Sequence, residues 1–584
     1  MSAKKSRNVK DSSDEAPVKK DLERQLRAQL AAVTGGLAPE DYTDAWWNWY
    51  FHLTKQPDKQ LSLVQSAFEK ALETWQFAAR AATGAAMPPE QAPGFADPAW
   101  NVWPFNVYAK SYTTWAAWLQ EAVAAGSEST DSGAARLRFA TQQAVEAASP
   151  ANFLHTNPEL LNKTVAESGQ NLVRGLKNWL EDAERALPGR RTSKSAQFEV
   201  GKDVAVTPGK VVFRNRLIEV LQYAPQTDSV YAEPVLITPA WIMKYYILDL
   251  SPRNSLVRYL VEKGHTVFVI SWKNPTSADR DLGMDDYVQL GFKDALDVVK
   301  RIVPKRKVHA VGYCIGGTLL AIAAALLGNE GDDRLASVSL FAALTDFSEP
   351  GELSVFISPN QLAMLEAVMS KSGVLESERM GAAFVMLRSR DLLWTPAVNT
   401  YLRGERAKPN DLMAWNQDGT RMPLRMHSEY LDRLYLKNEL AQGQFSIGSQ
   451  RVDLKSLRVP MFVVGTETDH VAPWQSVYKV RELTRSADYT FCLTSGGHNA
   501  GIVSGPAHPK RRHRLLTWSN ETDSLAPAEW LKAAPVQPDS WWPSWQRWLA
   551  EHSDPQRRPA PQIGAKRAAA QSELGDAPGQ YVRE

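Results

Sequence analysis

Residues 308–327 read VHAVGYCIGGTLLAIAAALL, and this stretch decides the fold. An apolar run from Val308 to Val311 is typical of a buried strand, and the run from Thr318 to Leu327 is typical of a helix. Between them, Cys314 is the third residue of a G-x-C-x-G pentapeptide. The flanking glycines let a turn tighten and let neighbouring elements approach closely. We therefore expect a strand, a sharp turn and a helix, with the Cys314 thiol exposed at the turn.

Composition is that of a water-soluble globular protein. Of the 584 residues, 44% are hydrophobic and 23% are charged, an ordinary balance for folded domains. The length exceeds one ordinary core, so we expect more than one domain. A net charge of +2 gives no general reason to expect nucleic-acid binding. No phosphate loop, dinucleotide fingerprint or metal-ligand cluster occurs in the sequence, so we expect no metal and no bound cofactor.

Cysteine count and apolar run length indicate a cellular location. The two cysteines, Cys314 and Cys492, argue against a disulfide framework and fit a reducing cytosol. The longest apolar run, Leu319–Leu327, is too short to span a membrane. Residues 1–20 do not resemble a signal peptide. We expect a cytoplasmic protein without a transmembrane segment.

Composition and the spacing of apolar residues divide the chain into four segments. Residues 1–25 are charged and poor in aromatics, so we expect disorder. Residues 26–197 have apolar side chains at three- and four-residue spacings, which predicts an α-helical N-terminal domain. Residues 198–554 alternate short β-like runs with helices and form the predicted catalytic domain. The tail, 555–584, is rich in Pro, Ala and Gln and is expected to be flexible.

Alternation of strands and helices after residue 198 predicts an α/β fold with a mostly parallel sheet. The first two predicted strands are close enough in sequence to pair as a hairpin. An insertion at about residues 345–458 reads as helical and irregular. It is either a cap over the nucleophile or a peripheral helical subdomain. The candidate strands are Lys210–Phe213, Ile218–Tyr223, Val235–Thr238, Thr266–Ile270, Val308–Val311, Val338–Ala342, Met461–Val464 and Tyr489–Leu493.

A thiol nucleophile needs a base and a group that orients the base. Asp469 follows one predicted strand, and His498 follows another on a Gly-rich loop. The order nucleophile, acid, histidine is that of the α/β-hydrolase fold. Because parallel strands meet ligands beyond their carboxyl ends, we predict a Cys314–His498–Asp469 triad at that edge.

Other residues compete for these roles or complete them. Asp346 also follows a strand and is the rival acid, whereas Cys492 lies inside a strand and reads as a buried structural thiol. The backbone N–H of Ile315, with that of Trp241 in the loop after the strand at 235–238, is expected to form an oxyanion hole.

A cysteine nucleophile narrows the chemistry. A Cys paired with His ionises readily and exchanges acyl groups with thioesters at little cost in free energy. The S-acyl enzyme remains activated, so a second nucleophile can take the acyl group. Acyl transfer is therefore one interpretation, and a Cys-triad hydrolase is the alternative.

The chain resembles the class I polyhydroxyalkanoate synthases from about residue 40 to the C-terminus. The matching segments are Gly312–Thr318, Lys244–Leu250, Ile270–Pro275, Ala414–Asn416, Asp469–Trp474, Gly497–His498, the tryptophan motif Ser540–Leu549, Gly564–Arg567 and Pro578–Val582.

The resemblance implies an acyltransferase that polymerises (R)-3-hydroxyacyl-CoA, 3-hydroxybutyryl-CoA being usual for the class, and releases CoA. Cys314 would carry the chain as a thioester. His498 would deprotonate the thiol and then the 3-hydroxyl of the incoming monomer, and Asp469 would orient His498. A homodimer, attachment to polyester granules, and an N-terminal domain that serves assembly and granule contact are also implied.

Two positions depart from the family pattern. Met243 stands where Asn is usual after Pro-Pro-Trp-Ile, and Asn499 stands where Ile often follows the histidine.

Weaker signals concern CoA. The basic run Lys510–Arg514 and Arg388 in the insertion are candidate phosphate contacts, although a solvated charge run and a structural ion pair fit equally well. His470, beside the predicted acid, is a candidate substrate-channel residue or a plain loop histidine.

Overall fold

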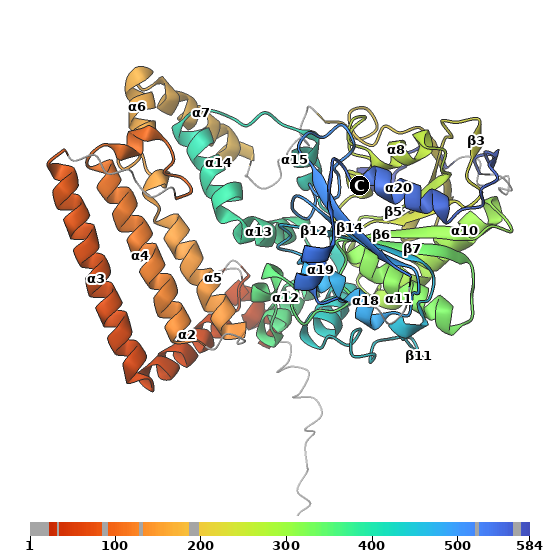
Figure 1. Ribbon diagram of the computed structural model, residues 1–584, viewed down its shortest axis with the longest axis horizontal. Helices are drawn as coiled ribbons and strands as arrows, with labels where there is room; N and C mark the ends of the chain where they lie inside the picture. Colours follow the sequence, from red (N-terminus) through yellow and green to blue (C-terminus); the bar gives the residue numbers. More distant parts are fainter. Residues whose placement is uncertain are drawn as a thin grey trace, which may run out of the picture.

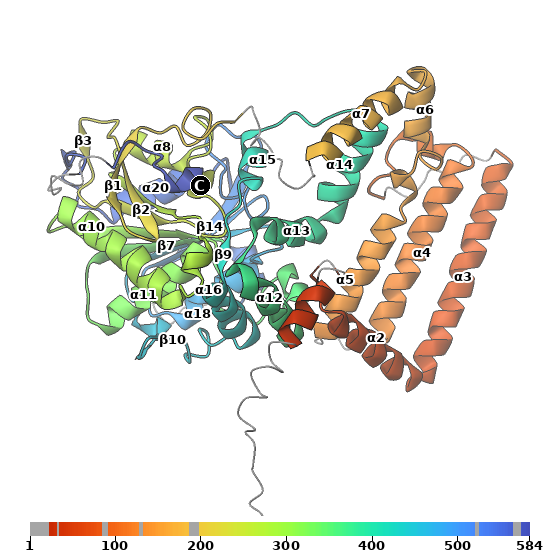
Figure 2. The same ribbon diagram turned by 180° about the vertical axis from the view of Figure 1, so that it is seen from behind.

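The computed structural model describes residues 23–31, 34, 36–84, 92–127, 132–185, 198–519, 525–564 and 574–584. These residues form two parts, a group of N-terminal helices and a large sheet covered by helices (Figures 1 and 2). The predicted sheet and the predicted helical N-terminal region are both confirmed. Of the segment expected to be disordered, residues 1–22 lie outside the described residues, and residues 23–25 belong to a helix that runs to residue 31.

The N-terminal part is built from long helices. They are α2 (Pro39–Thr54), α3 (Pro57–Ala82), α4 (Phe105–Ala125), α5 (Ser132–Ala147), α6 (Pro158–Ala166) and α7 (Gln170–Arg185), with 3₁₀ turns at Pro98–Asn101 and Pro150–Asn152. Helices α2, α3 and α6 begin at proline, whose missing N–H has no partner to lose at that position. Asn157 caps α6 by accepting the N–H groups of Glu159 and Leu160 at 2.9 and 3.2 Å.

The sheet has ten strands in the order β1-β2-β5-β4-β6-β7-β12-β13-β14-β15. The strands from β5 to β13 in this order run parallel, and the two strands at each edge are antiparallel. The strands are β1 (Gly209–Arg214), β2 (Ile218–Tyr223), β4 (Val235–Thr238), β5 (Val267–Trp272), β6 (Val308–Tyr313), β7 (Leu335–Phe341), β12 (Met461–Thr466), β13 (Tyr489–Thr494), β14 (Arg512–Trp518) and β15 (Val536–Pro538).

All eight predicted strands are confirmed, and β1 and β2 pair as the expected hairpin. The sequence prediction missed β14, whose first residues belong to the basic run Lys510–Arg514, and β15, which has only three residues. Strands β4, β6, β12 and β13 are buried on both faces, as expected for parallel strands between helical layers.

Helices cover both faces of the sheet. Helix α11 starts at the turn after β6 and is buried from Ile315 to Leu327, which explains why it is apolar on every side. Among the described residues, no helix combines the length and the apolar character that crossing a membrane requires. The helices that flank the sheet are α8 (Leu256–Glu262), α9 (Met284–Asp286), α10 (Asp294–Ile302), α11 (Ile315–Asn329), α17 (Trp474–Tyr478), α18 (Val480–Leu483), α19 (Pro527–Ala533) and α20 (Trp542–Glu551). Short 3₁₀ turns lie at Tyr245–Leu248 and Ser277–Asp279, and a π-helical turn lies at Tyr287–Lys293.

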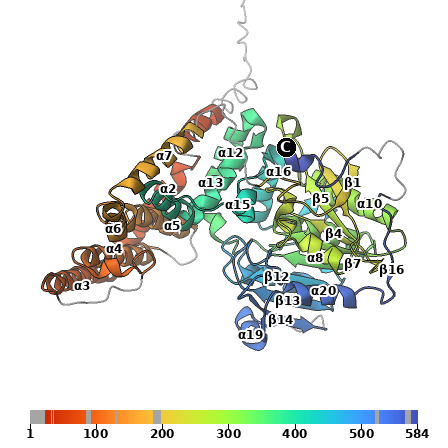
Figure 3. The same cartoon turned by 90° about the horizontal axis from the view of Figure 1, so that it is seen from above.

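The insertion between β7 and β12 is mostly helical and lies between the sheet and the N-terminal helices (Figure 3). It contains α12 (Pro359–Ser372), β8 (Val374–Leu375), α13 (Ser377–Leu387), α14 (Thr395–Ala397), α15 (Asp411–Asn416), β9 (Met422–Pro423), α16 (Leu424–Glu429), β10 (Ser446–Ile447), β11 (Gln450–Arg451), 3₁₀ turns at Glu352–Phe356 and Leu454–Ser456, and π-helical turns at Arg390–Trp394, Val398–Leu402 and Tyr430–Leu436.

The N-terminal helices are hydrogen-bonded to this insertion. Asn171 and Asn178 of α7 donate side-chain N–H groups to the carbonyls of Leu402 and Thr400, at 2.8 and 3.0 Å. A methyl group on Gly175 would lie 1.8 Å from the Tyr401 carbonyl oxygen. Only glycine allows α7 to approach the turn this closely.

The described residues of the C-terminal tail, which we expected to be flexible, contact the rest of the fold. Strand β16 (Arg558–Pro559) pairs with β3 (Ser229–Val230). Near the C-terminus, the N–H groups of Gln580 and Tyr581 donate to the buried carboxylate of Glu219 at 3.0 and 3.1 Å, and Val582 is fully buried. The tail is held by a partner on β2, which its own composition does not reveal.

Candidate active site

Cys314 lies at the turn between β6 and α11 with φ 54° and ψ −130°. This φ value is uncommon for a residue with a side chain, and such strain is kept only where the surroundings impose it. The Cys314 N–H donates to the Phe341 carbonyl at 2.8 Å, which ties the turn to β7. The thiol is half-buried.

Glycines make the turn possible by removing side chains at close approaches. A methyl group on Gly316 would lie 2.4 Å from the carbonyl oxygens of both Thr238 and Pro239. One on Gly317 would lie 2.5 Å from the Ala343 side chain. Since the loop after β4 therefore touches the first turn of α11, it also lies beside Cys314.

Asp469 follows β12, and its carboxylate is held by several donors. Oδ1 accepts the N–H groups of Val471 and Ala472 at 2.9 and 2.8 Å. Oδ2 accepts the Thr466 hydroxyl at 2.9 Å and lies 2.8 Å from His498 Nδ1. With Nδ1 donating to Asp469, Nε2 is the free nitrogen of His498, and Cys314 is close enough for its charge to act on the imidazole.

Charge, rather than burial, decides the protonation of this pair. Burial alone would lower the pKa of His498, but the charges of Asp469 and Cys314 and their hydrogen bonds outweigh it and raise that pKa well above its usual value. For Asp469, burial acts to raise the pKa, and the His498 charge with the backbone donors lowers it overall. The raised pKa of His498 therefore favours an imidazolium paired with the Asp469 carboxylate.

One expected oxyanion donor, Ile315, adjoins Cys314 in the chain, and the other, Trp241, lies in the loop that touches the first turn of α11. Ile315 is the first residue of α11, so its N–H has no acceptor within the helix. Trp241 is in the loop after β4, and its buried indole N–H donates to Met426 Sδ at 3.1 Å. Its carbonyl accepts the Thr420 hydroxyl at 2.5 Å, which fixes the loop to the insertion.

Two tyrosines of the insertion also lie near Cys314. The hydroxyls of Tyr430 and Tyr435, in one π-helical turn, are 3.2 Å apart. Burial, then their mutual contact, and then the nearby Cys314 raise the pKa of Tyr430 well above its usual range. Sequence reasoning missed both, because no motif marks a cap residue that tertiary folding brings to the nucleophile.

His470 lies close to Arg388 and to two residues of the triad, Asp469 and His498. Burial, followed by the Arg388 charge, lowers the pKa of His470 to about 4. The same guanidinium lies near Glu352, whose pKa is nevertheless raised by burial. Arg388, the residue after α13, therefore lies close to His470 and to the carboxylate of Glu352.

The rival residues lie elsewhere. The Asp346 carboxylate accepts the Ser348 N–H at 2.8 Å and the Asn438 side chain at 3.0 Å, so it serves the base of the insertion. Cys492 is fully buried in β13, and burial raises the pKa of its thiol well above the usual range.

The basic run is largely committed to structural contacts. Arg512 pairs with Glu467 at 2.7 Å, and Arg514 donates to the Ala534 carbonyl at 2.8 Å. Arg511 donates to the Ala500 carbonyl at 3.1 Å. These contacts hold β14 and the His498 loop together.

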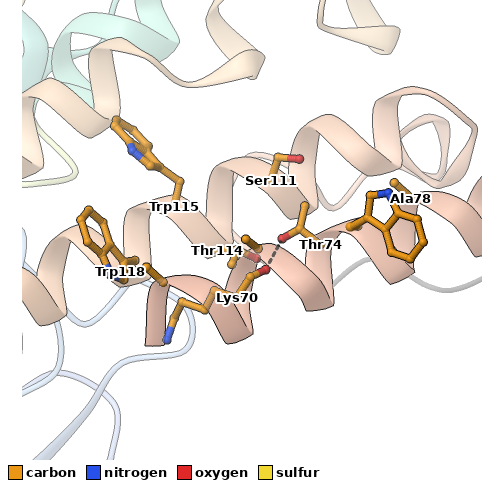
Figure 4. A pocket seen from close by; sticks show the side chains of 10 residues that line it. Lys70, Thr74, Ala78, Ser111, Thr114, Trp115 and Trp118 are labelled. Atoms are coloured by element: carbon orange, nitrogen blue, oxygen red, sulfur yellow. Dashed lines mark hydrogen bonds between the residues drawn. The ribbon is translucent and has the colours of Figure 1, made fainter. Parts of the chain in front are cut away.

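A separate groove lies in the N-terminal part between α3 and α4 (Figure 4). Its volume is about 520 Å³, and Trp75, Trp115 and Trp118 contribute to its lining. The Thr74 hydroxyl donates to the Lys70 carbonyl at 2.8 Å within it. Neither the groove nor any other described region brings three or more His, Cys, Asp or Glu side chains into an arrangement for a metal ion.

Comparisons with known proteins show which families the chain resembles. Residues 91–260 match a family model described as the poly-beta-hydroxybutyrate polymerase (PhaC) N-terminus. Residues 18–59 match a poly-beta-hydroxybutyrate polymerase N-terminal model, and residues 233–504 match the alpha/beta hydrolase fold.

Relatives cover most of the chain. A poly(3-hydroxyalkanoate) polymerase of Methylorubrum extorquens is 40% identical over 539 residues, which is 91% of this chain and 87% of that protein. Polymerase subunits of Rhizobium meliloti and Cupriavidus necator are each 39% identical, over 84% and 77% of this chain and 79% and 75% of their own lengths. The chain belongs to the poly(3-hydroxyalkanoate) polymerase family.

Proposed function

We propose that this polymerase joins (R)-3-hydroxyacyl groups from CoA thioesters into polyester, with Cys314 as the covalent carrier. The observation that carries the proposal is the His498–Asp469 hydrogen bond with Cys314 beside the imidazole, at the carboxyl edge of the parallel strands. The CoA thioester is already activated, so the reaction needs no metal and no bound cofactor.

Acylation begins when His498 Nε2 takes the Cys314 proton. The thiolate attacks the thioester carbonyl, and the N–H groups of Ile315 and Trp241 stabilise the tetrahedral oxyanion. The carbon–sulfur bond to CoA then breaks, and CoA leaves with the proton from His498. The product is an acyl thioester on Cys314.

Elongation uses the same base. His498 takes the proton of an incoming monomer's 3-hydroxyl, and the resulting alkoxide attacks the thioester on Cys314. An ester bond forms, and the sulfur leaves as a thiolate beside the imidazolium. The extended chain is then a CoA thioester, and the Cys314 thiolate takes it back with release of CoA, by a thioester exchange that is nearly balanced in free energy.

The candidate substrate contacts are two basic side chains near the triad. Arg388 and His470 are suited to the CoA phosphates and to the entrance of the acyl chain, because a guanidinium binds phosphate oxygens in a fork. We take 3-hydroxybutyryl-CoA as the substrate on the class I resemblance.

We also propose that the protein works in the cytoplasm as a homodimer at the polyester surface. Helix α3 supports the surface contact, since it exposes apolar side chains along one side: Leu61, Val64, Phe68, Leu72 and Trp75. Large exposed apolar patches usually mark binding surfaces.

The deciding assay is purified protein with 3-hydroxybutyryl-CoA, following thiol release and collecting insoluble product. We expect both, and we expect Cys314→Ala to abolish both with unchanged circular dichroism. Free 3-hydroxybutyrate in place of polyester would show a Cys-triad hydrolase instead. Undiminished turnover by Cys314→Ala would mean another nucleophile.

A further inference from the structure

A short hydrogen bond joins the neighbours of the nucleophile and the base. Tyr313 directly precedes Cys314, and Asn499 directly follows His498. The Tyr313 hydroxyl donates to Asn499 Oδ1 at 2.5 Å, across 186 residues of sequence. The Tyr313 ring centroid also lies 5.6 Å from that of the His498 imidazole.

Tyr313 is a rigid anchor. It ends β6, pairs with Phe341 of β7, and is 2% exposed. Burial, together with the charges of Cys314 and Asp469, raises the pKa of its hydroxyl well above the usual range. The hydroxyl therefore stays protonated and can donate at any working pH.

The rest of the His498 loop is held from other directions. The indole N–H groups of Trp541 and Trp542 donate to the carbonyls of Gly501 and Ile502, at 3.0 and 2.9 Å. These bonds hold the loop beyond Asn499. Asn499 directly follows His498, and its side chain restrains the loop at that point by binding Tyr313 of β6.

We propose that Tyr313 and Asn499 are positioning residues, whose hydrogen bond sets the separation of Cys314 and His498 and so the rate of the proposed acyl transfer. A buried hydroxyl left without a partner is costly, whereas replacing both partners by apolar groups is nearly neutral. In the family that the sequence resembles, Ile often stands at the position of Asn499. In this chain, Tyr313 and Asn499 therefore make through a hydrogen bond a contact that two apolar side chains can also make.

Three variants test the pair: Tyr313→Phe, Asn499→Ile and the double variant. We expect each single variant to lower kcat by about ten-fold, with KM within about two-fold. We expect the double variant to recover to within about three-fold of the unmodified protein, because two apolar groups then meet. A double variant whose loss equals the product of the single losses would overturn the proposal.

A second readout does not depend on polymerase activity. The rate of Cys314 alkylation by iodoacetamide, measured against pH without substrate, reports how well His498 supports the thiolate. We expect each single variant to shift the profile of alkylation rate against pH to higher pH. We expect the double variant to have nearly the profile of the unmodified protein. If the unmodified protein made no polymer, the proposed function would fail while this test of the pair remained valid.

Tyr581→Phe is the matched control, because the Tyr581 hydroxyl donates to the Asn215 carbonyl at 2.6 Å, in the C-terminal tail. It should leave both the alkylation profile and kcat unchanged. If Tyr313→Phe lowers the unfolding midpoint as Tyr581→Phe does, and leaves the alkylation profile unmoved, the pair is structural only and the proposal is wrong.

Discussion

The imidazole of His498 is placed between a carboxylate and a sulfur, and the carboxylate is itself immobilised. Two backbone N–H groups, the Thr466 hydroxyl and His498 all bind the Asp469 carboxylate. Each donor stabilises the charged form, so Asp469 remains ionised despite its burial. A fixed charge then selects one tautomer of His498, with the proton on Nδ1 and Nε2 free for Cys314.

Asp469→Asn tests this role of the charge. We expect kcat to fall by about 100-fold or more, because an amide neither fixes the tautomer nor stabilises the imidazolium. The pKa of His498 should move down from its raised value, and alkylation of Cys314 should need higher pH. The measurements are steady-state CoA release and iodoacetamide rates between pH 5 and 9.

Asp346→Asn is the control, since Asp346 also follows a strand but contacts Asn438 and Ser348. It should keep kcat within about three-fold. Equal losses in the two variants would remove Asp469 from its proposed role.

The turn into α11 depends on close backbone contact between elements. The helix starts where the loop after β4 crosses it, and the space for a side chain at Gly316 is taken by two carbonyl oxygens. This contact brings the Trp241 loop to the same place as Cys314. The proposed oxyanion hole thus requires a residue without a side chain at position 316.

Gly316→Ala should therefore separate the two elements. We expect a loss of about 3 kcal/mol or more in the free energy of unfolding, and activity below detection, because backbone atoms must shift to admit the methyl group. Urea unfolding followed by circular dichroism measures the first, and CoA release the second.

Gly381→Ala makes the matching change in an exposed helix. Apart from the adjoining residues and the backbone of α13 itself, no atom lies within 4 Å of the added methyl group, so the variant should be neutral or more stable by up to about 1 kcal/mol. A Gly316→Ala protein that behaved like Gly381→Ala would show that the contact is not required.

Across the whole molecule, buried histidines make the fold sensitive to acid. Burial, aided by neighbouring positive charges at the first two, lowers the pKa of His265 and His309 to about 3 and that of His427 to about 4. A depressed histidine pKa stabilises the fold fully above the unfolded value near 6.5, and this contribution is lost as pH falls. Below about pH 5.5 the three together should lower stability by about 4 kcal/mol per pH unit.

The unfolding midpoint in urea should therefore drop steeply between pH 6.5 and 4.5. His309, which hydrogen-bonds Ser337 and Ser553 at 2.7 and 3.0 Å, offers a variant. His309→Gln should make the dependence shallower by about one proton. An unchanged midpoint across this range would contradict the prediction.

The exposed face of α3 gives a prediction about surface binding. Phe68 and Trp75 are 70% and 68% exposed, so Phe68→Glu with Trp75→Glu should leave the unfolding midpoint unchanged. We expect binding to poly(3-hydroxybutyrate) particles to fall by ten-fold or more, measured by sedimentation, since apolar area is replaced by charge.

Ser62→Glu with Gln76→Glu adds the same charge at exposed polar positions of that helix. This control should bind nearly as well as the unmodified protein. Equal losses in both variants would mean that charge alone matters and that the apolar face does not bind polymer.

Local pattern was enough to predict the parallel strands and the positions of Cys314, Asp469 and His498. Each strand is buried on both faces and so reads as an apolar run, and each of the three residues follows the end of one. Parallel strands bring their carboxyl ends to one edge, so chain order alone predicts that the residues meet.

Tertiary structure alone decided the features that join distant segments. The bond from Tyr313 to Asn499, the two tyrosines of the insertion beside Cys314, and the docking of the tail on Glu219 have no local signature. Strand β14 was hidden because its charged residues are paired by distant partners such as Glu467. Periodicity reports whether a residue is buried, but a specific partner depends on how elements far apart in sequence pack together.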